Sequence, residues 1–246
     1  MKQYGLIGYP LGHSFSKKYF SKKFLKEGID ACYENYPIKD IDEFPKLIQS
    51  KPNLFGLNVT VPYKEKIIPY LDELDETARE VGAVNTIRIF RNDNVIRTKG
   101  FNTDVFGFEE TIIHELKNLH KSALILGTGG SSKAVAYVLK KLAIDYYFVS
   151  RKSTNGIFSY FDLSSETINK NLIIINTTPL GMYPNIDESP AIDYSAITGK
   201  HLLIDLIYNP EETLFLKKGK ANGATCLNGL KMLHYQADKA WKCFCE

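Results

Sequence analysis

Residues 123–139, ALILGTGGSSKAVAYVL, join a short apolar run, a cluster of glycines and an amphipathic run in immediate succession. This order predicts a buried strand, a tight turn and a helix. Gly127, Gly129 and Gly130 would let the backbone turn sharply and approach a pyrophosphate, and a helix that begins near Ser131 would offer its free N–H groups to the same anion. We therefore predict a dinucleotide-binding loop. The alternative is a glycine turn that simply joins a strand to a helix.

The strand after the glycine loop indicates which dinucleotide is bound. NAD-binding proteins of this kind carry an Asp or Glu at the end of that strand, where it accepts hydrogen bonds from the ribose 2′-hydroxyl. Here the strand DYYFVS (145–150) leads into Arg151 and Lys152, so the acid is missing and two cations follow. Cations suit a 2′-phosphate, which carries nearly two negative charges. The pattern favours NADP over NAD, and the alternative interpretation is a solvated basic turn.

Apolar runs and helical patterns alternate on both sides of this loop. Strands separated by helices imply right-handed crossovers and mainly parallel sheets. In the second half of the chain the pattern predicts helices at 104–119, 131–141 and 229–244, and strands at 122–127, 145–150, 172–179 and 201–208. In the first half it predicts strands at 3–8, 31–37 and 55–62, helices at 16–26, 40–50 and 74–81, and a hairpin formed by 83–90 and 94–98.

The two series of elements meet at residues 100–103, where we place a domain boundary. We predict a two-domain α/β fold, with an N-terminal parallel-rich α/β domain at 1–101 and a Rossmann-like NADP-binding domain at 102–228. The C-terminal helix, 229–246, carries an apolar stripe and is expected to return to the first domain. The residues of the stripe are Leu230, Leu233, Ala237, Ala240, Trp241 and Phe244.

Bulk composition excludes several classes of protein. The chain has 246 residues, 44% of them hydrophobic, which is enough for two modest domains. A net charge of +3 is too small to indicate binding to nucleic acid or to a membrane surface. Because we find neither a membrane span nor a signal-peptide pattern, we expect a cytoplasmic protein. Cys32, Cys226, Cys243 and Cys245 lack C-x-x-C spacing, and we interpret the terminal C-x-C as reduced thiols rather than a metal-binding tail.

The segment GLNVTVPYKEK (56–66) places polar side chains on one side of a strand that is otherwise built for packing. Apolar residues alternate with Asn58 and Thr60, and Lys64 follows shortly after. Further polar residues occur at or after the ends of other predicted strands, namely Ser14, Ser16, Asn85, Asn102, Thr103 and Asp104. Ligands of parallel α/β sheets bind outside the carboxyl ends of the strands. We therefore predict a pocket of hydroxyl and amide groups around one acid/base lysine, suited to a small polyol.

Each of these residues also has a structural interpretation. Ser16 and Thr103 are good helix N-caps, Asn85 could satisfy a turn, and Lys64 could be an ordinary solvated side chain. A shared pocket is favoured because Asn58 lies on the strand face that leads directly to Lys64.

Taken in chain order, the motifs resemble those of the shikimate dehydrogenase family. The matching segments are GYPLGHSFS (8–16), GLNVTVPYK (56–64), GAVNT (82–86), GFNTD (100–104), the glycine loop, NTTPLGM (176–182), DLIYNP (205–210) and NGLKMLHYQA (228–237). The resemblance runs nearly end to end. It implies that the first domain and the last helix bind shikimate, and that the enzyme reversibly reduces 3-dehydroshikimate with NADPH in aromatic amino-acid precursor synthesis. It leaves open whether the enzyme is a monomer or a homodimer.

The resemblance also implies a role for each matching residue. Lys64 would supply the proton for the ketone oxygen, and Asp104 would orient it and share its charge. Ser14 and Ser16 would grip the substrate carboxylate, and the other substrate contacts would come from Asn58, Thr60, Asn85, Tyr208 and Gln236. The NADP-binding residues would be Gly127, Gly129, Gly130, Ser131, Arg151, Lys152, Thr178, Leu206 and Gly229, with no metal.

The chain departs from the family pattern mainly at the 2′-phosphate clamp. Arg151 is kept, but Lys152 stands where the family has threonine, and Asn155 stands near the place of a second arginine. Lys17 replaces a proline after Ser16, and because proline there mainly fixes φ, we expect the carboxylate grip to survive. We expect a looser preference for NADP than is usual. The alternatives are a quinate/shikimate dehydrogenase that uses NAD or both cofactors, and a non-catalytic sensor of NADP or a metabolite.

Overall fold

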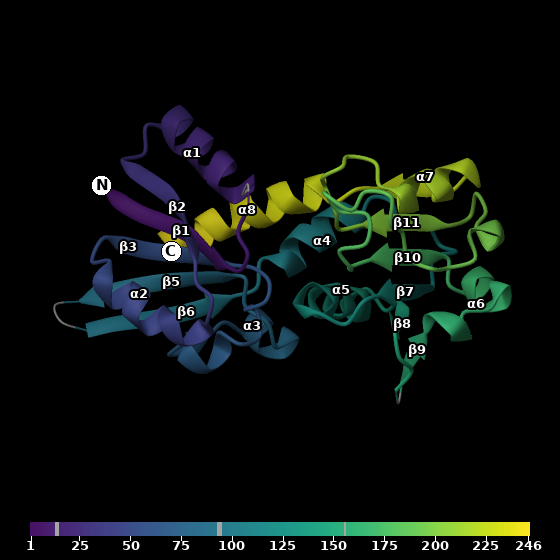
Figure 1. The fold of residues 1–246 in the computed structure, drawn as a ribbon, viewed down its shortest axis with the longest axis horizontal. Helices are drawn as coiled ribbons and strands as arrows, with labels where there is room; N and C mark the ends of the chain where they lie inside the picture. Colours follow the sequence, from purple (N-terminus) through teal and green to yellow (C-terminus); the bar gives the residue numbers. More distant parts are fainter. Residues whose placement is uncertain (13–14, 93–94, 155) are drawn as a thin grey trace. The chain divides into compact units, whose positions relative to one another are not determined.

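The computed structural model describes residues 1–12, 15–92, 95–154 and 156–246. These residues form two compact units, each with its own sheet (Figure 1). Unit 1 comprises Met1–Thr103 and Ala237–Glu246, and unit 2 comprises Asp104–Gln236. The chain therefore passes between the units twice, once at residues 103–104 and once inside its last helix.

Unit 1 is built on a six-stranded mixed sheet in the order β2-β1-β3-β5-β6-β4. Strand β1 pairs in parallel with β2 and β3, whereas β5 pairs antiparallel with β3 and β6. The β5–β6 ladder confirms the predicted hairpin, although its turn residues 93 and 94 lie outside the described residues. The strands are β1 (Lys2–Gly8), β2 (Ala31–Pro37), β3 (Leu54–Val59), β4 (Glu73–Leu74), β5 (Thr86–Asn92) and β6 (Val95–Phe101).

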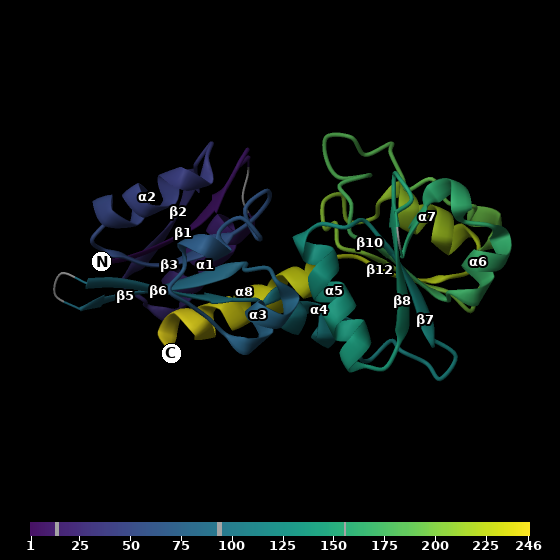
Figure 2. The same ribbon diagram turned by 90° about the horizontal axis from the view of Figure 1, so that it is seen from below.

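Helices cover both faces of this sheet, and Figure 2 shows α2 and α8 on opposite sides of it. The described helices of unit 1 are α1 (Phe15–Glu27), α2 (Phe44–Ser50) and α3 (Glu76–Val81), with 3₁₀ turns at Ile41–Glu43 and Ile68–Tyr70. Helix α1 and the end of α8 (Leu230–Cys245) pack on one face through an aromatic cluster, which consists of Tyr4, Phe20, Phe24, Tyr33, Trp241 and Phe244. These rings cover one face of the sheet, and a second apolar cluster, which includes Phe44 of α2, covers the other.

Unit 2 contains a six-stranded sheet in the order β12-β11-β10-β7-β8-β9, and all of its described pairs are parallel. Numbered along the unit and read from the β9 edge, this is the order 3-2-1-4-5-6 of a Rossmann fold. Its elements are α4 (Asp104–Ile112), β7 (Ser122–Leu126), α5 (Gly130–Lys141), β8 (Asp145–Ser150), β9 (Ile157–Ser159), a 3₁₀ turn (Tyr160–Asp162), α6 (Ser165–Lys170), β10 (Ile173–Asn176), a 3₁₀ turn (Tyr194–Ala196), β11 (Leu202–Asp205), α7 (Leu214–Ala221), β12 (Thr225–Leu227) and the first part of α8.

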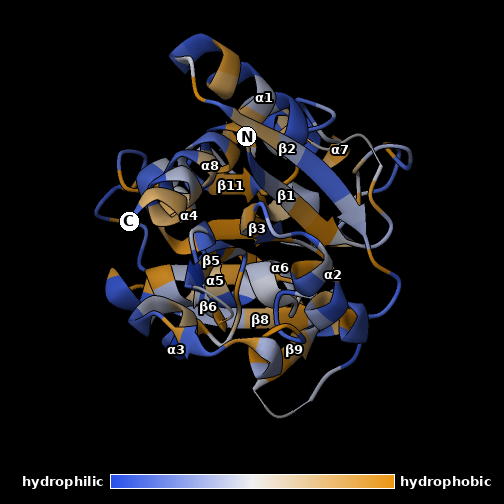
Figure 3. Cartoon of the chain, turned by 90° about the vertical axis from the view of Figure 1, so that its left-hand side faces the viewer, coloured by the Kyte–Doolittle hydropathy of each residue, from blue (hydrophilic) through white to orange (hydrophobic). Residues whose placement is uncertain are grey.

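The central strands of both sheets are apolar along nearly their whole length. Every residue of β10 and β11 is buried, as are four of the five residues of β7. Figure 3 accordingly colours β3 and β11 largely as hydrophobic. Strands with both faces covered by helices lose the alternation of polar and apolar residues. The predicted two-domain α/β fold class, with a Rossmann-like second sheet, is confirmed.

The predicted helix at 104–119 is wrong beyond Ile112. The main-chain N–H of Lys117 donates to Nδ1 of His120 (3.1 Å), which forms a turn in place of the helical hydrogen bond. Ile113 and Leu119, which extend the apolar pattern, are 43% and 42% exposed. The prediction also lacked β9, α6, α7 and β12, which are short and have weak patterns. None of the described helices is long and apolar enough to cross a membrane.

Helix α4 approaches the first part of α8 very closely at Gly107. A Cβ at this position would lie 2.6 Å from the main-chain oxygen of Met232 and 3.0 Å from Cβ of Gln236. The oxygen belongs to a helical backbone and has little freedom to move. Only glycine therefore permits this helix contact.

Substitution of Gly107 by alanine tests this contact through the sign of its effect. In an open helix, Gly→Ala stabilises by about 1 kcal/mol. Here we expect Gly107→Ala to lower the free energy of unfolding by about 1–3 kcal/mol because the methyl group overpacks the contact. The comparison is Gly219→Ala in α7, whose Cβ would meet a side-chain atom, the terminal methyl of Leu203 (2.3 Å), rather than a main-chain atom. Urea unfolding measures both variants, and a gain in stability for Gly107→Ala would contradict the close approach.

Candidate functional site

A buried polar network lies at the carboxyl end of β3 in unit 1, and Asn58 is at its centre. The Asn58 side chain is 5% exposed. Its Nδ2 donates to the main-chain oxygen of Asn85 (3.2 Å) and to Oγ1 of Thr86 (3.0 Å). Its Oδ1 accepts a hydrogen bond from the hydroxyl of Tyr33 (2.8 Å). Burial raises the pKa of Tyr33 well above its ordinary value, so this hydroxyl keeps its proton.

The network continues from Asn85 to the end of unit 1. Nδ2 of Asn85 donates to Oγ1 of Thr103 (3.0 Å), and Oδ1 of Asn85 accepts from the Thr103 main-chain N–H (2.7 Å). Thr103 is the last residue before α4, so this pair of bonds fixes the point at which the chain leaves unit 1. The sequence placed Thr103 among the polar residues near strand ends, with a helix cap as the alternative, and indicated no role for Tyr33 or Thr86.

Main-chain bonds fix the segment that carries Thr60 and Lys64. The Thr60 N–H donates to the main-chain oxygen of Ile7 at the end of β1 (2.9 Å). The oxygen of Lys64 accepts from the N–H of Val84 (2.7 Å), the residue before Asn85. The main chain of Lys64 is therefore bonded to the residue that precedes Asn85 in the network. The side chain of Lys64 is half-buried.

The structure places the predicted carboxylate-binding serines only in part. Ser16 lies in the first turn of α1 and shares a hydrogen bond with the hydroxyl of Tyr33. Ser14 lies outside the described residues. Unit 1 thus brings together Ser16, Asn58, Thr60, Lys64 and Asn85 near one end of its sheet, and their contact with a substrate stays a prediction.

In unit 2 the glycine loop follows β7, at the point where the strand order reverses. Gly127 has a φ of +114°, and a Cβ there would lie 2.6 Å from Oγ1 of Thr177. A Cβ on Gly129 would meet nothing within 4 Å, so space lies beside the amino end of α5. That helix begins at Gly130 and presents Ser131 in its first turn. This arrangement suits a pyrophosphate, which free helix N–H groups and the helix dipole bind.

The other predicted cofactor residues also lie at or after the carboxyl ends of strands in this sheet, which we call the carboxyl edge. Thr178 donates to Oδ1 of Asn176 through its N–H (3.0 Å) and its hydroxyl (2.6 Å). The Leu206 N–H donates to the main-chain oxygen of Asn176 (3.0 Å), and a Cβ on Gly229 would lie 2.1 Å from the Leu206 oxygen. Arg151 follows β8 at this edge and, like Lys152, is exposed. The residues present therefore fit a phosphorylated dinucleotide.

Asp205 organises this edge, although sequence reasoning had assigned it no role. It is fully buried at the end of β11. Its Oδ1 accepts from Nδ2 of Asn176 (3.1 Å) and from the Ile207 N–H (3.0 Å), and its Oδ2 accepts from Oγ1 of Thr213 (2.6 Å). Burial raises the pKa of Asp205 to about 6, an effect that these hydrogen bonds oppose. An acid that ends an apolar strand was the signal that could have revealed it.

Two predicted substrate residues and the predicted catalytic aspartate belong to unit 2. Asp104 is the buried first residue of α4, one turn before Gly107. Gln236 lies against Gly107 across the α4–α8 contact, and its Nε2 donates to the main-chain oxygen of Leu233 (3.1 Å). Tyr208 follows β11, and burial raises its pKa. Asp104 and Gln236 therefore lie on packed helices of one unit, whereas Lys64 belongs to the other unit.

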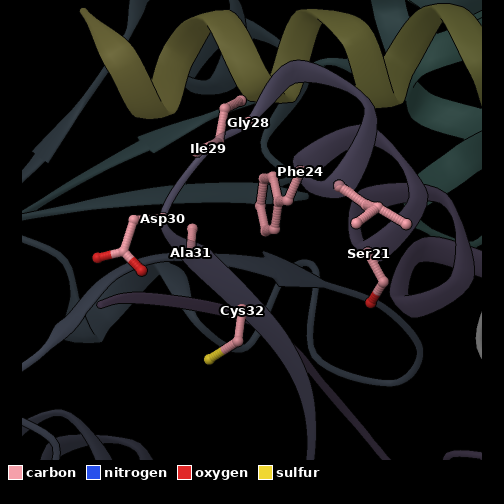
Figure 4. A pocket seen from close by; sticks show the side chains of 8 residues that line it. Ser21, Phe24, Gly28, Ile29, Asp30, Ala31 and Cys32 are labelled. Carbon is pink, nitrogen blue, oxygen red and sulfur yellow. The ribbon is translucent and has the colours of Figure 1, made fainter.

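Other features of the chain lie apart from these residues. A pocket of about 410 Å³ lies between the end of α1 and the start of β2. Phe24, Asp30 and Cys32 are among the residues that line it (Figure 4). It lies at the amino end of β2, opposite to the end at which Asn58 lies. Burial raises the pKa of Cys32, which disfavours a reactive thiolate. Over the described ranges, no group of three His, Cys, Asp or Glu residues is arranged to hold a metal ion.

The titration of Asp205 predicts a pH dependence of stability. Its folded pKa of about 6 is above the ordinary value of 3.8, so between these values the folded protein binds more protons than the unfolded chain. Its contribution to stability is fully present below pH 4 and is lost as the pH rises through 6, by on the order of 3 kcal/mol. We expect Asp205→Asn to abolish this loss.

The measurement is the difference in unfolding free energy between wild type and Asp205→Asn at pH 4, 5, 6 and 7. Other titrating groups cancel in this difference. Asp162→Asn is the control, because Asp162 accepts two hydrogen bonds from Ser159 (2.7 Å each) and the pKa of its carboxyl is lowered. A difference for Asp205→Asn that stays constant with pH would contradict the titration.

Comparison with known proteins places these features in a family. Residues 6–87 match the family model described as the shikimate dehydrogenase substrate binding domain. The chain is 37% identical to "Shikimate dehydrogenase (NADP(+))" of Methanosphaera stadtmanae, over 98% of this chain and 90% of the relative. It is 39% identical to the protein of the same name from Halothermothrix orenii, over 97% and 89% of the two chains.

A solved structure has the same fold. Shikimate 5-dehydrogenase of Thermus thermophilus, in complex with NADP(H) and shikimate, superposes with a TM-score of 0.85 and 26% identity, over 99% of this chain and 93% of that protein. The Methanosphaera and Halothermothrix proteins carry the assignment, because their identity is higher and their coverage nearly complete. The chain belongs to the shikimate dehydrogenase family.

Proposed function

We propose that the chain catalyses the reversible, NADP-dependent oxidation of shikimate to 3-dehydroshikimate. The observation that carries this proposal is the set of amide and hydroxyl groups around Asn58 and Asn85, to which the main chain of Lys64 is attached. Such groups suit a small polyol, because each ring hydroxyl needs a hydrogen-bond partner when it leaves water. The names of the relatives supply the identity of that polyol.

Lys64 is the proposed acid and base of the reaction. In the oxidation its Nζ takes the proton of the reacting hydroxyl, and in the reduction it returns this proton to the ketone oxygen. Asp104 is the proposed partner that orients the ammonium group and shares its charge. The nicotinamide, when bound, supplies or accepts the hydride at the ring carbon. The remaining substrate contacts are assigned to Ser14, Ser16, Asn58, Thr60, Asn85, Tyr208 and Gln236.

The two parts of the chain have different proposed tasks. We assign substrate binding to residues 1–101 with the C-terminal helix 229–246, and NADP binding to residues 102–228. The glycine loop and Ser131 would bind the pyrophosphate, and Arg151 with Lys152 the 2′-phosphate. Thr178, Leu206 and Gly229 line the same edge and would bind the rest of the cofactor.

Initial rates with different substrate and cofactor pairs test the reaction. We expect turnover of shikimate with NADP at a higher kcat/KM than with NAD, and little turnover of quinate. Arg151→Ala should lower kcat/KM with NADP by about 10–100-fold, since a hydrogen bond to a charged group contributes about 1.5–3 kcal/mol. The rate with NAD, which has no 2′-phosphate, is the internal control and should change little. Equal use of NAD or quinate would indicate a broader dehydrogenase, and no turnover would contradict the proposed reaction.

Substitution of Lys64 tests the proposed acid and base. Lys64→Ala should lower kcat by about 10²–10⁴-fold, the usual contribution of general acid–base catalysis, with little change in the dissociation constant of shikimate. Lys66→Ala is the matched control, because Lys66 lies two residues further on and is exposed. Steady-state kinetics and a direct binding measurement together separate catalysis from affinity. An unimpaired kcat in Lys64→Ala would remove this assignment.

A further inference from the structure

We propose that Tyr33 is a positioning residue of the substrate site. Its buried hydroxyl fixes the orientation of the Asn58 amide, so that Asn58 acts toward the substrate as a hydrogen-bond acceptor. This inference rests on the proposed function and deepens it, since it specifies what the substrate must offer to Asn58.

The Tyr33 side chain is buried, with its ring stacked and its hydroxyl hydrogen-bonded. It is 1% exposed, and its ring stacks on that of Phe20, with centroids 4.7 Å apart and an interplanar angle of 11°. Phe20 lies one turn after Ser16 in α1. Tyr33 itself is in β2, and because β1 separates β2 from β3, its side chain reaches across β1 to Asn58. The hydroxyl therefore joins residues from the helix and the strand that carry predicted substrate contacts.

The partners of the network determine which atom of the Asn58 amide faces Tyr33. The main-chain oxygen of Asn85 can only accept, so the amide atom 3.2 Å from it must be the donor, Nδ2. Oδ1 then faces Tyr33, and the Tyr33 hydroxyl must donate its single proton there. Since that proton is committed, the bond between Tyr33 and Ser16 requires Ser16 to be the donor. Hydrogen bonds thus run in one direction, from Ser16 through Tyr33 to Asn58.

This direction defines what Asn58 can offer to a ligand. Both of its N–H groups already donate, one to Asn85 and one to Thr86. The remaining capacity is the second lone pair of Oδ1, which accepts from a donor such as a ring hydroxyl. If a carboxylate draws the Ser16 proton to itself, Tyr33 still donates to Asn58. The acceptor role of Asn58 is therefore the same with or without an anion at Ser16.

Tyr33→Phe removes the hydroxyl and keeps the ring. We expect the KM for shikimate to rise about tenfold, which is the effect of one lost hydrogen bond of about 1.4 kcal/mol. We expect kcat to change by less than about threefold and the KM for NADP to stay constant, because the lost bond positions a group that binds substrate and transition state alike. A purely structural role of Tyr33 would lower stability without this selective rise in KM.

Two further variants make the test decisive. Tyr70→Phe is the control, because the Tyr70 hydroxyl bonds to Asp42 in the same unit, apart from the network; its kinetic constants should match those of wild type. The double variant Tyr33→Phe/Asn58→Ala should have the same KM as Asn58→Ala, since Tyr33 acts through Asn58. An unchanged KM in Tyr33→Phe, or additive effects in the double variant, would overturn the inference while an active wild type upholds the proposed function. A wild type without shikimate turnover would overturn both.

Discussion

The hydrogen bond from Nδ2 of Asn58 to the main-chain oxygen of Asn85 (3.2 Å) determines how the polar groups at this end of unit 1 are oriented. It links the end of β3 to the start of β5, where the sheet changes from parallel to antiparallel pairing. A carbonyl only accepts, so this one contact determines the orientation of the amide and of each hydroxyl bonded to it. Because the groups are buried, an unpaired member would cost about 1–3 kcal/mol, and the whole set is therefore held in one arrangement.

In unit 2 a buried carboxylate, rather than an amide, joins the ends of neighbouring strands through hydrogen bonds. Asp205 is the last residue of a fully buried strand, and its carboxylate accepts hydrogen bonds from Asn176, Ile207 and Thr213. These bonds hold the ends of β10 and β11 together at the edge that also carries the glycine loop. Desolvation of the charged group opposes folding near neutral pH. The buried carboxylate thus lowers stability at neutral pH while its hydrogen bonds fix these strand ends beside the glycine loop.

The sequence was most informative where one pattern determines the structure. The apolar strand, glycine turn and helix around Gly127 predicted the Rossmann-like sheet. The prediction was possible because parallel strands with both faces covered must be apolar throughout. The alternation around Asn58 predicted a half-buried strand, whereas β3 is buried along nearly its whole length and Asn58 lies inside a hydrogen-bond network. The end of α4 was missed because its apolar pattern continues past Ile112, whereas the main-chain N–H of Lys117 donates to Nδ1 of His120 and forms a turn at 117–120.

The partners of the site residues were not predictable from the same patterns. Tyr33 is separated from Asn58 by 25 positions and by an intervening strand, and nothing local distinguishes it from the other tyrosines of the chain. Asp205 likewise depends on Thr213 and Asn176, which lie in different elements. Sequence motifs identify residues that face a ligand, because their chemistry is specific. The residues that hold them in place need only supply a donor or an acceptor at one point in space, and that point is defined only once the sheets have formed.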